Sequence, residues 1–118
     1  MWLNRKFRLT RSTDFKRVRR SGKSYAHPLV VLIALPNHSL HTHFGIAASR
    51  SVGSAVQRNR AKRMLREALR PLLPEVQPGW DVVLLSRAPI VQAHLDQVQE
   101  GLRSCLRRAD LLRLPYGH

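Results

Sequence analysis

Three short apolar segments limit the folds that this chain can adopt. They are LVVLIAL at residues 29–35, FGIAAS at residues 44–49 and WDVVLLS at residues 80–86. Short, mainly apolar runs bounded by proline, glycine or polar residues are typical of strands, so each segment predicts a β-strand. The connection between the first two segments is short and polar, which favours an antiparallel hairpin. The chain is therefore expected to build a sheet.

Helical patterns precede, separate and follow these strands. Capping residues, spacing of apolar side chains and stop signals predict helices at about 12–22, 54–73 and 89–112. The order is αββαβα, which indicates one sheet with helices packed on it, an α/β or α+β sandwich. We expect residues 1–118 to form a single domain, because a chain of this length can bury a sizeable core. Residues 1–11 are basic and lack a period, so we expect a flexible arm.

Positive charge is concentrated in the first part of the chain. The sequence contains 21 Lys and Arg residues against seven Asp and Glu residues, a net charge of +14. Residues 1–70 contain sixteen of the basic residues but only two acidic ones, whereas residues 71–118 contain five of each. A basic region of this density attracts a polyanion, and nucleic acid is the commonest polyanion in a cell.

Other partners and compartments are less consistent with the sequence. No apolar run approaches the roughly 18 residues of a membrane-spanning helix, so we expect no membrane partner and a cytoplasmic location. The single cysteine, Cys105, excludes an internal disulfide. It lies on the apolar stripe of the last predicted helix, which favours a core residue over a reactive thiol.

The helix predicted at residues 54–73 has two different faces. Its large apolar side chains are Met64, Leu65, Ala68, Leu69 and Leu72. The other side carries Asn59, Arg60, Lys62, Arg63, Arg66 and Arg70. Glu67 is the one acid that can offset them, through Arg63 or Arg70. A solvated helix face normally mixes its charges, so this pattern favours a polyanion site over a merely solvated surface.

The segment from Phe44 to Arg70, FGIAASRSVGSAVQRNRAKRMLREALR, resembles the signature of the protein subunit of bacterial ribonuclease P. Its motif R-N-x-x-K-R-x-x-R-E is matched at every position, by Arg58, Asn59, Lys62, Arg63, Arg66 and Glu67. A second family pattern near the start of the chain is matched by Leu9, Asp14, Phe15, Val18 and Gly22. The resemblance covers nearly the whole chain, from about Arg8 to Leu112.

The resemblance implies a noncatalytic role for the protein. In that family a large RNA is the catalyst, and the small protein binds this RNA and the 5′ leader of precursor transfer RNA. Mg²⁺ ions are held mainly by RNA and phosphates, the protein contributes no catalytic residue and no metal ligand, and we expect a monomer in a 1:1 complex with the RNA. The family also joins the second and third predicted strands by a left-handed crossover, against the usual right-handed rule.

The resemblance also assigns two sets of binding residues. For the RNA subunit they are Arg50, Arg58, Asn59, Arg60, Lys62, Arg63, Arg66 and Arg70. For the leader they are Phe15, Lys16, Arg19, Ile33 and Ser49. Single strands are held by stacking and by basic grooves. Arg19 and Ile33 stand where relatives often have aromatic residues, so we expect less stacking here, and Phe15 is open to interpretation as a core residue.

Alternatives remain open from the sequence. A ribosomal or chaperone-like RNA-binding protein would share the charge pattern but would show no dependence on a leader. A self-sufficient nuclease is disfavoured, because the seven acidic residues are scattered and metal-dependent nucleases gather carboxylates around two cations. His38, His41 and His43 lie in one polar loop, which is weak evidence for a metal site.

Overall fold

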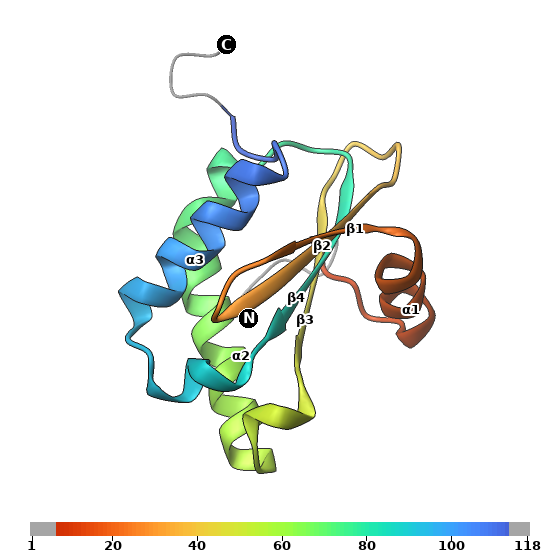
Figure 1. Cartoon of the computed structure of the whole chain (residues 1–118). Helices are drawn as coiled ribbons and strands as arrows, with labels where there is room; N and C mark the ends of the chain where they lie inside the picture. The colour runs from red at the N-terminus through yellow and green to blue at the C-terminus, as the bar shows by residue number, and fades with distance from the viewer. Residues whose placement is uncertain (1–6, 114–118) are drawn as a thin grey trace.

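The computed structural model describes residues 7–113 and contains one four-stranded mixed sheet with three α-helices (Figure 1). The elements are α1 (Ser12–Ser21), β1 (Lys23–Ala26), β2 (Val30–Pro36), β3 (His43–Ala48), α2 (Ala55–Leu69), β4 (Trp80–Ser86) and α3 (Leu95–Arg108). Short 3₁₀ turns cover Arg50–Val52, Arg70–Glu75 and Ala88–Gln92. The α+β class expected from the sequence is confirmed.

The strand order is β1-β2-β4-β3, which differs from the predicted pairing. β2 is antiparallel to both β1 and β4, while β3 is parallel to β4. The hairpin predicted between residues 29–35 and 44–49 is therefore wrong, because β4 lies between those strands. β4 is buried along nearly its whole length and needs a neighbour on each side. The β3-α2-β4 connection is a parallel crossover, and its left-handed sense stays a prediction.

β1 was not predicted from the sequence. It reads KSYA and three of its four residues are exposed, so it has no apolar pattern to reveal it. It pairs with the outer edge of β2, where Lys23 lies opposite Ala34 and Ala26 opposite Val31. A short edge strand with a lysine is common at the border of a sheet, because it discourages pairing with another chain.

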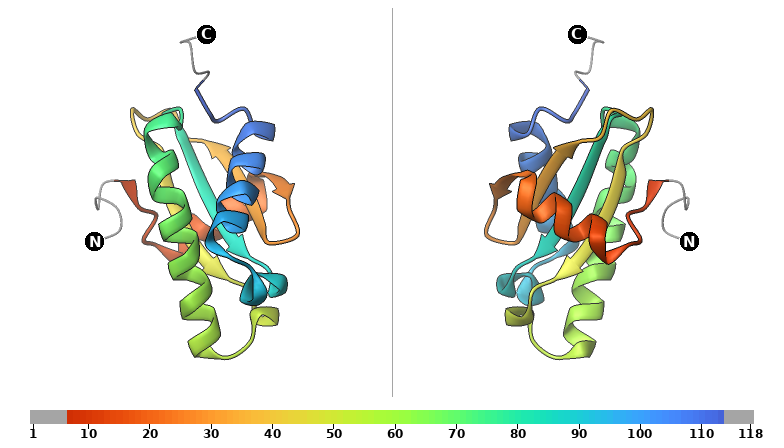
Figure 2. Two further views of the ribbon diagram at one scale, coloured as in Figure 1. Left: turned by 90° about the vertical axis from the view of Figure 1, so that its left-hand side faces the viewer. Right: turned by 90° about the vertical axis from the view of Figure 1, so that its right-hand side faces the viewer.

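Helices cover both faces of the sheet (Figure 2). α2 and α3 pack on one face and enclose the larger core, whose fully buried members include Leu32, Leu65, Leu84 and Leu102. Cys105 belongs to this core as predicted, and burial raises the pKa of its thiol. α1 lies on the opposite face over a smaller cluster formed by Leu9, Val18, Ile33 and Val83.

Several boundaries differ from the sequence prediction. α2 ends at Leu69 and continues as a 3₁₀ turn, because Pro71 and Pro74 have no N–H group to donate. α3 begins at Leu95, not at Pro89, and His94 and Gln97 form a capping box at its start.

Part of the predicted flexible arm is fixed in the structure. The Leu9 N–H donates to the Phe44 carbonyl at 2.9 Å, and Leu9 is buried. Residues 1–6 of the arm lie outside the described residues. In residues 7–113, no helix has the length and apolar character that crossing a membrane requires.

Candidate nucleic-acid interface

The start of α2 is fixed by local hydrogen bonds. The Gln57 N–H donates to Ser54 Oγ at 3.3 Å, and the Ser54 N–H donates to Gln57 Oε1 at 3.0 Å. This capping box satisfies two N–H groups that the first turn would otherwise leave unpaired. Gly53 precedes it with φ of 131°, a conformation that favours glycine. The basic motif that follows is therefore presented from a defined helix end.

α2 has one buried face and one cationic face, as predicted. Ala61, Leu65, Ala68 and Leu69 are buried against the sheet and α3. The basic motif faces outward: Asn59, Arg60, Arg63 and Arg70 are exposed, and Arg58, Lys62 and Arg66 are half-buried. The helix thus holds its cations on a rigid element, which is better suited to a defined contact than a loop.

The cations of α2 are not neutralised within the described chain. The ion pairs of residues 7–113 join Arg17 to Asp14 and Asp81, His43 to Asp81, and Arg103 to Glu75. The spacing allows Glu67 to offset Arg63 or Arg70, but in this part of the chain Glu67 has no cation within 4.0 Å. Side chains of such exposed pairs gain little from staying together. The positive face of α2 is therefore open to an external anion.

A groove separates the N-terminal half of α2 from the outer edge of β3. Its volume is about 350 Å³, and it is lined by Ile46, Ala47, Ala48, Ala55, Arg58, Asn59 and Lys62. The Phe44 carbonyl points to this outer edge, where it accepts from Leu9. Since backbone groups of alternate residues point the same way along a strand, those of Ile46 and Ala48 also face the groove. The groove thus combines small apolar walls, a strand edge and two cations.

A second surface lies where α1 crosses the opposite face of the sheet. Phe15 rests directly on Gly45, and a Cβ atom added to Gly45 would lie 2.5 Å from Phe15 Cζ. Phe15 is half-buried, so its ring packs on the strand and still offers surface. Lys16 and Arg19 are exposed on the same helix. α1 therefore presents one aromatic ring and two cations beside the sheet.

A buried carboxylate ties α1 to the sheet. Arg17 Nη2 donates to Asp81 Oδ2 at 2.5 Å, and Asp81 Oδ1 accepts from Asn37 Nδ2 at 2.9 Å and from His43 Nδ1 at 2.8 Å. Burial by itself would raise the pKa of Asp81, but the hydrogen bonds from Asn37, Arg17 and His43 outweigh it and hold the pKa below its ordinary value. The same carboxylate raises the pKa of Arg17. This network therefore holds α1 in a defined position on the sheet.

Comparison with known proteins identifies the family. The family model described as Ribonuclease P matches residues 3–110. The chain belongs to the ribonuclease P protein family. A protein of Herpetosiphon aurantiacus named "Ribonuclease P protein component" is 39% identical over 109 residues, covering 92% of this chain and 89% of the relative. One of the same name from Chloroflexus aurantiacus is 40% identical over 114 residues, covering 96% and 84%.

Solved structures of the ribonuclease P protein share the fold. The Staphylococcus aureus protein has a TM-score of 0.80 at 28% identity, with 91% of this chain and 98% of that chain covered. The Thermotoga maritima protein has a TM-score of 0.76 at 28% identity, with 86% and 96% covered. The family model at residues 3–110 spans the sheet and all three helices, so the resemblance seen in the basic motif holds for nearly the whole chain.

The residues predicted to bind the RNA subunit belong to α2 and to the segments directly before and after it. Seven of them belong to α2 or its C-terminal end, and Arg50 is exposed in the 3₁₀ turn that links β3 to α2. Ser49, which was predicted to bind the leader and not the RNA subunit, directly follows β3 and is half-buried, and its hydroxyl is 2.8 Å from that of Ser51. Arg58, Asn59 and Lys62 line the groove beside β3, whereas Arg60 lines a separate hollow against the 3₁₀ turn Ala88–Gln92, and the individual RNA contacts stay predictions.

The residues predicted to bind the leader differ in how exposed they are. Phe15, Lys16 and Arg19 present surface on α1, whereas Ile33 is only 6% exposed and packs beneath α1 with Val18 and Val83. The same sheet face continues through Val31, Leu85 and Ala47, which lie in one cross-strand row and are half-buried. Sequence reasoning missed this row. Side chains alternate between the two faces of a sheet along each strand, so the row could have been predicted from β2 and β4 if their pairing had been known.

The loop histidines have separate environments. His43 donates to Asp81, and the His41 ring meets the Phe7 ring edge to face, with centroids 4.9 Å apart. His38 is exposed and has φ of 59°. Across residues 7–113, no group of three His, Cys, Asp or Glu side chains is arranged to hold a metal ion.

Proposed function

We propose that this chain is the RNA-binding protein subunit of a bacterial ribonuclease P. It assists a catalytic RNA in removing the 5′ leader of precursor transfer RNA, as a monomer in a 1:1 complex in the cytoplasm. The observation that carries the proposal is the unopposed cationic face of α2, which bears the complete family motif and lies beside a groove at the edge of β3.

The α2 surface is suited to structured RNA. Arg58 and Lys62 line the groove, and Arg63 is exposed beside them. Guanidinium groups make planar, bidentate contacts with phosphates, and Asn59 can donate to and accept from a sugar hydroxyl or a base edge. The Nε atom of Arg66 is buried without a hydrogen-bond partner in the described chain. RNA binding would relieve the repulsion between these unopposed cations.

The surface between α1 and the sheet is suited to a single strand. Phe15 offers a ring for stacking, the row of Val31, Leu85 and Ala47 offers an apolar floor, and Lys16 and Arg19 supply charge for the backbone. This combination of one stacking platform with a basic rim binds single-stranded nucleic acid with little sequence preference. We assign the 5′ leader to this surface.

The chemistry is assigned to the RNA. Asp14 and Asp81 are engaged by Arg17, and Glu75 by Arg103, so these carboxylates already have cationic partners. Among the described residues no three candidate ligands converge, so this part of the chain offers no Mg²⁺ centre built from protein side chains alone. We therefore propose that Mg²⁺ is held by the RNA and its phosphates, and that the protein positions substrate.

The test is reconstitution with the cognate RNA subunit at low magnesium concentration. The protein should accelerate cleavage of precursor transfer RNA, and the acceleration should be larger for a substrate with a leader of several nucleotides than for one with a single leader nucleotide. Cleavage by the protein without RNA would favour a self-sufficient nuclease. Equal binding of unrelated RNAs without any acceleration would favour a ribosomal or chaperone-like protein, and the proposal would be wrong.

A further inference from the structure

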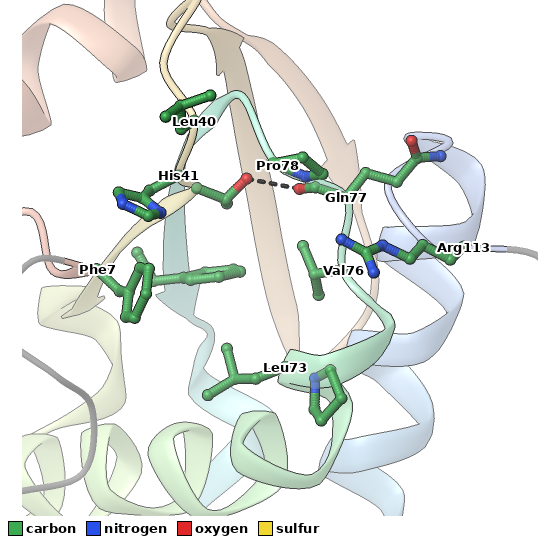
Figure 3. Close-up of a pocket in the computed structure, with 11 residues that line it drawn as sticks. Phe7, Leu40, His41, Leu73, Val76, Gln77, Pro78 and Arg113 are labelled. Atoms are coloured by element: carbon green, nitrogen blue, oxygen red, sulfur yellow. Dashed lines mark hydrogen bonds between the residues drawn. The ribbon is translucent and has the colours of Figure 1, made fainter.

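A second cavity lies at the other end of the sheet from the start of α2 (Figure 3). Its volume is about 360 Å³. It is formed where β3 and β4 begin, next to the 3₁₀ turn Arg70–Glu75 that follows α2. Phe44, Leu73 and Val76 form its apolar wall, and the edge-to-face pair of Phe7 and His41 lies at one side. The cavity shares no lining residue with the groove beside α2.

Some polar groups at this cavity are paired within the described part of the protein, and two side chains are not. The Gln77 N–H donates to the Leu111 carbonyl at 2.7 Å, and the Gln77 carbonyl accepts from Thr42 Oγ1 at 2.6 Å. The backbone of Gln77 is thus fixed, while its side-chain amide makes no hydrogen bond within the described chain. Arg113 adds a guanidinium group that has no ion-pair partner among residues 7–113. No acidic side chain is among the described residues that line the cavity.

An exposed leucine marks the rim. Leu40 is 86% exposed, the largest exposure of any large apolar side chain in the described chain, and it belongs to the lining of the cavity. An apolar side chain that is exposed to water is unfavourable, and covering it with a flat apolar surface lowers the free energy. The rim therefore favours a ligand with an apolar face.

We propose that this cavity binds one nucleobase of a single-stranded RNA segment. A base has a flat aromatic face for the Phe7, His41 and Leu40 side, and a hydrogen-bonding edge that the Gln77 amide can meet by both donating and accepting. Arg113, which lines the same cavity, supplies a cation for the attached phosphate. The lack of a lining carboxylate disfavours a cationic ligand or a basic peptide. This inference rests on the proposed RNA-binding function and adds a site that the basic motif does not contain.

The placement of the cavity suits a strand that also crosses α2. Lys62, Arg66 and Arg70 follow one another at intervals of four residues from the groove towards the cavity. From Arg58 to Leu73 the helix and its 3₁₀ extension span about 20–25 Å, at roughly 1.5–2 Å per residue. A single-stranded segment that leaves the groove can therefore place a base in the cavity while its backbone meets these cations.

The experiment is a titration of the full chain, with methyl groups labelled for NMR, with adenosine 5′-monophosphate. Ribose 5-phosphate, which has the sugar and phosphate but no base, is the matched control. We expect saturable shifts at Leu40, Leu73 and Val76 with the nucleotide alone. Equal shifts with ribose 5-phosphate, or nucleotide shifts confined to Ile46 and the alanines of the groove, would overturn the base site while leaving the RNA-binding function intact.

Variants test the same site. Leu73→Trp fills the cavity with a larger ring and should weaken nucleotide binding by about tenfold or more, equivalent to about 1.4 kcal/mol. Leu40→Asp places a negative charge at an exposed rim position, where folding is unaffected, and should also weaken binding. Leu95→Asp makes the same change at a leucine that is 42% exposed at the start of α3, and should bind normally. Undiminished binding by both cavity variants would contradict the proposal.

Discussion

Replacing Asp81 by asparagine removes the charge that holds α1 to the sheet. The Asp81 side chain is 6% exposed, and it accepts hydrogen bonds from Arg17, Asn37 and His43. An amide has the same shape but only one accepting oxygen, so its NH₂ group must face either Arg17 or the pair formed by Asn37 and His43. Asp81→Asn therefore loses at least one charge-assisted hydrogen bond and brings two donors together.

The magnitude follows from the exposure of the partners. A hydrogen bond to a charged group contributes about 1.5–3 kcal/mol. The Arg17 side chain is 40% exposed and can turn towards water, so the larger cost of leaving a charge buried does not apply. We expect the free energy of unfolding to fall by about 1.5–3 kcal/mol, a decrease in Tm of roughly 6–12 °C at about 4 °C per kcal/mol for a domain of this size.

The assay is urea denaturation of the wild-type protein and of two variants. Asp14→Asn is the matched control, because Asp14 also pairs with Arg17, at 3.3 Å, but on the surface. That exposed pair should contribute no more than about 1 kcal/mol. A double-mutant cycle of Asp81→Asn with Arg17→Met isolates the coupling between the two side chains. In reconstituted ribonuclease P, Asp81→Asn should reduce the preference for long leaders more than it reduces the affinity of the protein for the RNA subunit.

Two results would refute this reasoning. If Asp81→Asn costs no more than Asp14→Asn, the buried carboxylate does not stabilise the attachment of α1. If Asp81→Asn is destabilising but the preference for long leaders is unchanged, the position of α1 does not control the leader surface.

Three further predictions concern pH, packing and charge. Because the folded-state pKa of Asp81 lies below its ordinary value of 3.8, its stabilisation is complete above that value and is lost as the pH falls through the folded-state pKa. The stability difference between wild type and Asp81→Asn, measured by denaturation from pH 7 to pH 2, should shrink only below about pH 4. Gly45→Ala should cost about 1–3 kcal/mol in urea denaturation, because its Cβ would meet the Phe15 ring at 2.5 Å. Arg63→Ala with Arg66→Ala should reduce the slope of log affinity against log salt, about −4 to −5 for six phosphate contacts, by about one to two, whereas Arg107→Ala on the exposed end of α3 should not.

The cationic helix could be predicted from the sequence because its information is local. A period near 3.6 residues separates Leu65 and Leu69 from Arg63 and Arg70 whatever the rest of the chain does. Element type was predicted correctly for the same reason in β2, β3 and β4. The start of α3 was not predicted correctly. The apolar spacing continues through Val91, so the sequence does not reveal the break in the helix at His94.

Strand pairing and the Asp81 network could not be predicted, because both depend on distant residues. Asp81 meets Arg17 across 64 positions and Asn37 across 44, and no periodicity joins those segments. The burial of Ile33 could not be predicted for the same reason, because it depends on where α1 crosses the sheet. β1 was missed for a different reason, because an edge strand with polar residues carries almost no hydrophobic signal.

β3 links the two proposed RNA surfaces. Gly45 and Ala47 belong to the face that α1 crosses, while Ile46 and Ala48 alternate with them and line the groove beside α2, which Ala47 also borders. A shift of β3 by one residue would exchange these sets and remove the glycine from beneath Phe15, so both surfaces depend on one register. That register is fixed by β4 on one side and by the Leu9 hydrogen bond to Phe44 on the other. On the proposed function, the relative position of the two RNA surfaces therefore depends on the register of a single strand rather than on a flexible connection.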